Sequence, residues 1–69
     1  MKLGFIGTGY IAKSVIMGIL GSKLKINKIF ISERNNKISS FLSKKSRKIV
    51  IINNNQEIIN RSNWVFLSV

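Results

Sequence analysis

Three small residues near the start of the chain, Gly7, Gly9 and Ala12, have the spacing G-x-G-x-x-A. They follow a short apolar run, Leu3 to Ile6, and a helical apolar pattern begins directly after them. In such a strand–turn–helix, the first glycine permits a tight turn and the second lets a phosphate approach the backbone. The third small residue lets the helix pack on the strand. The chemistry that this spacing suits is binding of a pyrophosphate at a helix N-terminus, as in dinucleotide-binding units.

A second set of polar residues, Ser32-Glu33-Arg34-Asn35, follows the second apolar run. NAD-binding folds place an acid there for the ribose 2′-hydroxyl, whereas NADP-binding folds place an arginine near the 2′-phosphate. Ser32 and Arg34 together could cradle a phosphate, but Glu33 would repel it if it pointed the same way. We therefore favour NADP(H) as cofactor and keep NAD(H) open. The alternative is that Glu33 and Arg34 are solvated turn residues.

The elements that must position these residues alternate between strand and helix with short connections, which indicates a parallel α/β sheet. The predicted strands are 2–6, 28–32, 48–52 and 64–69. Because the third carries apolar residues on both faces, we expect it to be covered on both. The predicted fold is α/β, a partial Rossmann-type sheet in the order 3-2-1-4 with helices on both faces, truncated after the fourth strand.

Apolar residues at helical spacing predict three helices between these strands. The first spans 10–20 and is expected to end at Gly21 in the left-handed conformation. Gly18 within it is expected to permit a close approach to the sheet. We expect the second helix to turn Ile38, Phe41 and Leu42 inward, and Asn55 to cap the third.

The chain is strongly basic, with a net charge of +10 from 12 basic and two acidic residues. Such a charge can indicate a nucleic-acid or anionic-membrane partner. However, the basic residues are spread along the chain, and their one cluster, 44–48, contains no aromatic residue. No segment approaches the roughly 18 apolar residues of a membrane span. We therefore expect neither nucleic acid nor membrane as a partner.

The chain has few side chains suited to acid–base catalysis or metal binding, because it contains no His, no Cys and only two side-chain carboxylates, Glu33 and Glu57. We predict neither catalytic residues nor a metal site. The lack of Cys fits a reducing compartment, and the glycine-broken N-terminus does not fit a signal peptide. We predict a cytoplasmic protein.

The sequence resembles the N-terminal NAD(P)-binding domain of the pyrroline-5-carboxylate reductase family over almost its full length. The opening, Lys2 to Gly9, and the closing strand, Val65 to Val69, carry the more specific part of the resemblance. Ser32 to Asn35 and Asn55 to Glu57 are similar to the family's second-strand end and third-helix start. The chain departs from the family at Tyr10-Ile11, where Asn-Met is usual, and it ends before a usual Lys-Pro.

The resemblance implies that residues 1–69 are the N-terminal part of a dinucleotide-binding domain. The helical C-terminal domain, which builds the dimer and the substrate pocket in the family, is absent. It implies a homo-oligomeric full-length enzyme of proline biosynthesis that reduces 1-pyrroline-5-carboxylate with NAD(P)H. The 69-residue chain alone is expected to be inactive.

The resemblance also implies a set of cofactor-binding residues. They are Gly7, Thr8, Gly9, Tyr10 and Ile11 at the pyrophosphate, Ser32 and Arg34 at the 2′-phosphate, Asn55 near the adenine-side ribose, and Ser68 and Val69 beside the path to the nicotinamide. Two alternatives stay open. One is another NADP-dependent oxidoreductase of similar fold, F420-linked or like a hydroxyacid dehydrogenase. The other is a small basic nucleic-acid-binding protein, which would need basic residues interleaved with aromatic ones.

Overall fold

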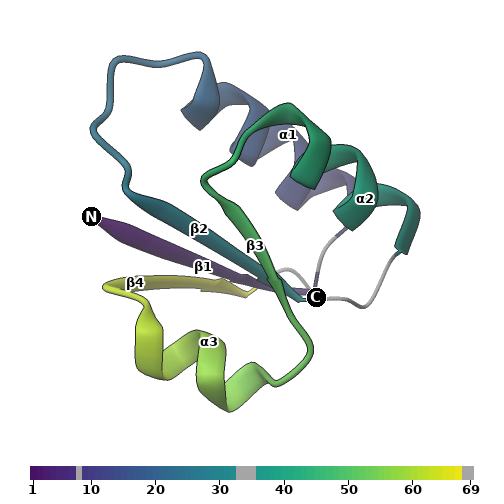
Figure 1. The fold of residues 1–69 in the computed structure, drawn as a ribbon, viewed down its shortest axis with the longest axis vertical. Coiled ribbons are helices and arrows are strands. Elements are labelled where there is room, and N and C mark those ends of the chain that lie inside the picture. The colour runs from purple at the N-terminus through teal and green to yellow at the C-terminus, as the bar shows by residue number, and fades with distance from the viewer. Residues whose placement is uncertain (8, 33–35, 68–69) are drawn as a thin grey trace.

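The computed structural model describes residues 1–7, 9–32 and 36–67, which form one parallel sheet with helices on both faces (Figure 1). The strands are β1 (Lys2–Ile6), β2 (Lys28–Ser32), β3 (Ile49–Ile52) and β4 (Trp64–Leu67). The helices are α1 (Tyr10–Leu20), α2 (Asn36–Lys45) and α3 (Asn55–Arg61). All the strand pairs are parallel, in the order β3-β2-β1-β4. The predicted fold class and strand order are confirmed.

Helices α1 and α2 cover one face of the sheet, and α3 covers the other (Figure 1). Side chains alternate between the two faces along each strand. On the α1–α2 face, Leu3 and Phe5 of β1 join a core with Ala12 and Ile16 of α1. Phe5 and Ile16 are fully buried, and burying a side chain of this size stabilises the fold by about 1.5–3 kcal/mol. This larger core fixes α1, and therefore the start of α1, against β1.

The α3 face is thinner and brings α3 very close to β1. Its core consists of Phe30, Ile52 and Ile58, with Ile6 packed against it. A Cβ atom added to Gly4 would lie 2.7 Å from Cγ2 of Ile58 and would also clash with Oγ of Ser62. The close approach of helix to sheet is therefore at Gly4. Our prediction that Gly18 permits it was wrong, because a Cβ atom on Gly18 would meet nothing within 4 Å.

Two predicted helix ends differ in detail from the structure. Gly21 ends α1 with φ −83°, so the left-handed conformation predicted there was wrong. The last turn instead closes through Ser22, whose N–H and hydroxyl both donate to the Ile19 carbonyl, which removes the need for a left-handed cap. At α3 the cap is Asn54 and not Asn55, because the Asn54 side chain accepts from the Glu57 N–H at 3.2 Å.

Two apolar side chains are more exposed than the sequence pattern predicted. Strand β3 is covered on both faces as predicted, since Ile49 is buried in the core on the α1–α2 face and Ile52 in the core on the α3 face. It is an outer strand of the described sheet, however, and its Ile51 is 38% exposed. Phe41 is 36% exposed instead of pointing inward. The Nζ atoms of Lys13 and Lys45 lie 4.4 and 4.9 Å from its ring centroid, which makes Phe41 a contact between α1 and the end of α2.

None of the helices in the described ranges is long and apolar enough to cross a membrane.

Candidate dinucleotide site

The turn that links β1 to α1 has the conformation that the glycine motif requires. Gly7 has φ 83°, in the left-handed region where a side chain is strained. Gly9 is extended, with φ −120°, and α1 begins at the next residue, Tyr10. Thr8, the predicted binding residue between them, lies outside the described residues. The geometry at Gly7 explains why that position requires glycine.

The start of α1 is suited to an anion. Gly9 is the N-cap residue and has no side chain, so it offers no cap to the first turn of the helix. The first turn contains no acidic residue. Its N–H groups and the positive end of the helix dipole therefore face the turn without a competing carboxylate at the cap or in that turn.

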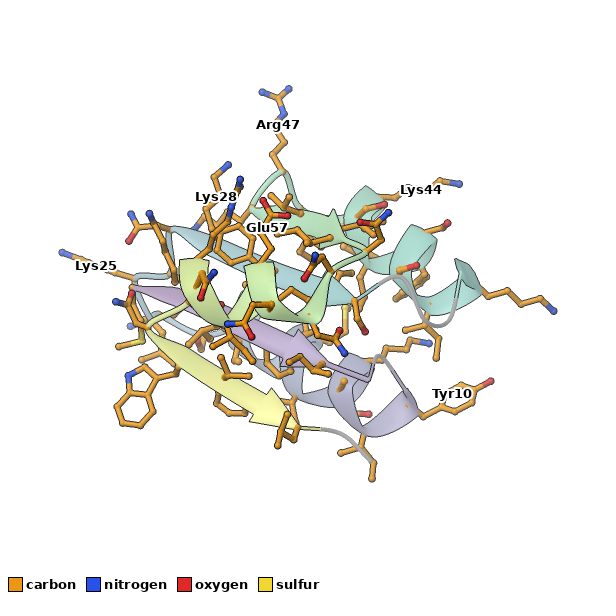
Figure 2. All side chains as sticks on the ribbon, turned by 90° about the horizontal axis from the view of Figure 1, so that it is seen from below. Tyr10, Lys25, Lys28, Lys44, Arg47 and Glu57 are labelled. Atoms are coloured by element: carbon orange, nitrogen blue, oxygen red, sulfur yellow. The ribbon has the colours of Figure 1, made fainter. Side chains whose placement is uncertain are left out.

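Side chains around this start divide into buried and exposed ones. Ala12 is only 2% exposed and packs in the core between α1 and the sheet, as expected for the third small residue of the motif. Tyr10 and Ile11 are both exposed. Figure 2 shows the Tyr10 ring extending away from the sheet at the start of α1.

Ser32 connects the two predicted parts of the site. It is the last residue of β2, is only 5% exposed, and accepts a hydrogen bond from the Gly7 N–H at 3.0 Å. The end of β2 is thereby tied to the glycine turn that follows β1. Glu33 and Arg34, on which the preference for NADP or NAD depends, lie outside the described residues.

Asn55 lies at the same edge of the sheet. It is the first residue of α3 and follows the end of β3, while Gly7 and Ser32 lie at the ends of β1 and β2. The carboxyl ends of parallel strands share one edge, and ligands of open α/β sheets bind there. Ser68 and Val69 follow β4 in the sequence and lie outside the described residues.

Charge around the described part of the site is positive. Lys13 lies in the first two turns of α1. Glu57, the acidic residue within the described ranges, lies on α3 and forms an ion pair with Arg61 at 2.8 Å. Among these residues, no group of three or more His, Cys, Asp or Glu side chains lies together as a metal site would require. The arrangement can bind and orient an anionic cofactor.

Sequence reasoning placed Ser32 in the site but missed its contact with Gly7. The parallel register pairs Phe5 with Ile31, so the next residue of β2 lies beside the end of β1. A serine at the last position of β2, beside the residue that precedes the first glycine of the motif, was the signal that could have predicted this bond.

Fold and site together define a Rossmann-type dinucleotide-binding unit. The model of a protein family described as NADP oxidoreductase, coenzyme F420-dependent, matches residues 2–69. The chain belongs to this family, which is shared with pyrroline-5-carboxylate reductases, and is an NADP-dependent oxidoreductase domain. Searches of curated proteins and of solved structures gave no match.

Proposed function

We propose that residues 1–69 are the N-terminal, NADP(H)-binding part of a reductase that converts 1-pyrroline-5-carboxylate to proline. The observation that carries the cofactor part is the left-handed glycine turn at Gly7 leading into α1, whose N-cap, Gly9, has no side chain. The sequence resemblance supports the choice of substrate. When bound, the cofactor supplies the hydride, and the chain's own residues bind and orient it.

In this proposal the binding residues divide along the cofactor. Gly7, Thr8, Gly9, Tyr10 and Ile11 hold the pyrophosphate, mainly through backbone N–H groups. Arg34, with Ser32 at the end of β2, belongs to the 2′-phosphate end. Asn55 lies near the adenine-side ribose, and Ser68 and Val69 border the path to the nicotinamide.

The remaining parts of the proposal concern the whole enzyme. We propose that substrate binding and homo-oligomer formation belong to a helical C-terminal domain of the full-length protein, and that the enzyme acts in the cytoplasm. The 69-residue chain then supplies no catalytic residue, and nucleic acid and membrane are not partners.

A second candidate is an F420-linked NADP oxidoreductase, which the description of the matching family as coenzyme F420-dependent favours. The two candidates differ in the partner that exchanges a hydride with NADP(H). Turnover assays of the full-length protein with 1-pyrroline-5-carboxylate and with coenzyme F420, each with NADPH or NADP⁺, distinguish them. Turnover with F420 alone would contradict the pyrroline-5-carboxylate proposal.

Replacing Arg34 tests the preference for NADP(H). If the guanidinium meets the 2′-phosphate, Arg34→Ala should weaken NADPH binding by about 1.5–3 kcal/mol, the range for a hydrogen bond to a charged group, and leave NADH binding unchanged. Titration calorimetry with both cofactors measures the difference. Arg47→Ala is the matched control, because Arg47 lies on the connection before β3 and extends away from the sheet (Figure 2). Equal losses for NADPH and NADH would contradict the assignment.

A further inference from the structure

We propose that Ser32 is a positioning residue for the glycine turn, whose hydroxyl holds the Gly7 amide in place, and that it does not itself contact the 2′-phosphate. The inference rests on the proposed dinucleotide function and assigns Ser32 a different role within it. A positioning role predicts an effect on every ligand that carries a pyrophosphate. A 2′-phosphate contact predicts an effect on NADPH alone.

The burial of Ser32 and its hydrogen bond to Gly7 support the positioning role. The Ser32 side chain is 95% buried, and its oxygen accepts from the Gly7 N–H at 3.0 Å across the gap between β2 and the turn. A hydroxyl that is buried against the backbone of the turn is poorly placed to meet a phosphate in solvent. The same bond is well placed to fix the turn.

Gly7 is the residue of the turn that most needs such a fixed point. Its φ is 83°, but a glycine can adopt many other backbone conformations about as readily. The residue itself therefore does not hold the turn in one geometry. The register of β1 and β2 ends at the pair Phe5 and Ile31. The Ser32 hydroxyl extends the connection between the two strands beyond that pair to the first glycine.

The consequence for binding follows from geometry. The direction of the Gly7 peptide sets where the next N–H groups and the start of α1 face, and these are the groups that a pyrophosphate meets. Without the Ser32 hydroxyl the turn samples more conformations, and binding must then select one of them. The affinities for NADPH and NADH should therefore fall by the same factor.

The experiment compares Ser32→Ala, Ser32→Val and Ser32→Thr in the 69-residue chain. Valine and threonine have nearly the same shape, and only threonine keeps the hydroxyl. The first measurement is the hydrogen-exchange rate of the Gly7 amide by NMR, with the Ile6 amide as internal reference. We expect faster exchange at Gly7 in the alanine and valine variants, and a rate near that of the native chain in the threonine variant.

The second measurement is the affinity for NADPH and for NADH. Loss of one neutral hydrogen bond should weaken both by about 2- to 12-fold in the alanine and valine variants. Ser62→Ala is the matched control, because the Ser62 hydroxyl also bonds to the backbone, donating to the Ile58 carbonyl at 2.6 Å, but Ser62 precedes β4 at the opposite edge of the sheet. It should change neither the Gly7 exchange rate nor the affinities.

The outcomes separate the inference from the function on which it rests. Unchanged Gly7 exchange in the alanine and valine variants overturns the inference, whatever the affinities are. A loss for NADPH alone also overturns it and restores the 2′-phosphate contact. If the native chain binds neither cofactor, the proposed function fails for this chain, and the Gly7 exchange rate alone decides whether Ser32 holds the turn.

Discussion

Gly4 and Gly7, three residues apart on and after β1, are required for different physical reasons. Gly7 is required by the backbone, because its φ is 83°. Gly4 is required by its neighbours, because a Cβ atom there would clash with Ile58 and Ser62 of the α3 segment. The motif pattern predicted the first requirement. It could not predict the second, because the clash depends on where α3 crosses the sheet.

Replacing Gly4 should therefore cost stability. In Gly4→Ala the new methyl group pushes on α3, and overpacking of this kind costs about 1–3 kcal/mol. The free energy of unfolding from urea titration measures the effect. Gly18→Ala is the control with the opposite sign, because nothing lies near Gly18 and alanine is favoured over glycine within a helix by about 1 kcal/mol. A Gly4→Ala chain as stable as the native one would show that α3 does not press on β1.

At the scale of elements, the starts of α1 and α3 differ in how they are capped. α3 begins with a side-chain cap, since Asn54 accepts from the Glu57 N–H. α1 begins at Gly9, which has no side chain, and its first turn contains no acid. A structural helix benefits from the cap, whereas a helix that receives an anion must leave its first N–H groups accessible. The uncapped start of α1 is therefore the arrangement that the proposed cofactor binding requires.

The position of the α3 cap shows the limit of sequence reasoning about elements. Asn53, Asn54 and Asn55 have identical side chains, so the sequence indicates an asparagine cap in this stretch but does not show which of the three it is. Our prediction of Asn55 was one residue too late. Only the backbone distinguishes them. Asn54 is extended, with φ −126° and ψ 113°, while Asn55 is already helical. By contrast, strand and helix order followed directly from the apolar periodicity.

This difference between neighbouring asparagines is testable. Asn54→Ala should lower the free energy of unfolding by about 1 kcal/mol, a typical value for loss of an N-cap. Asn55→Ala, one residue along and exposed, should be close to neutral for stability. Thermal or urea unfolding followed by circular dichroism measures both. A larger loss for Asn55→Ala would move the cap back to the position predicted from the sequence.

At the scale of the whole molecule, an apolar outer strand favours association between copies of the chain, whereas a high net charge opposes it. β4 is an outer strand of the described sheet, and outer strands carry unpaired backbone groups that can pair with another chain. Phe66 of β4 stacks on Phe5 with ring centroids 4.8 Å apart, yet it remains partly exposed, as are Trp64 and Leu67. The net charge of +10 opposes contact between two copies. Association through β4 should therefore depend on salt.

Light scattering of the 69-residue chain tests this balance. We expect its mean mass to rise with concentration, and to rise more at about 1 M salt, where the screening length falls to about 3 Å, than at about 0.15 M. Leu67→Lys should reduce the rise because it places a charge on the outer strand. Leu24→Lys is the matched control, since Leu24 is similarly exposed (63% against 71%) but lies between α1 and β2. A monomer at all concentrations in high salt, or equal effects of the two lysines, would show that β4 is not the contact.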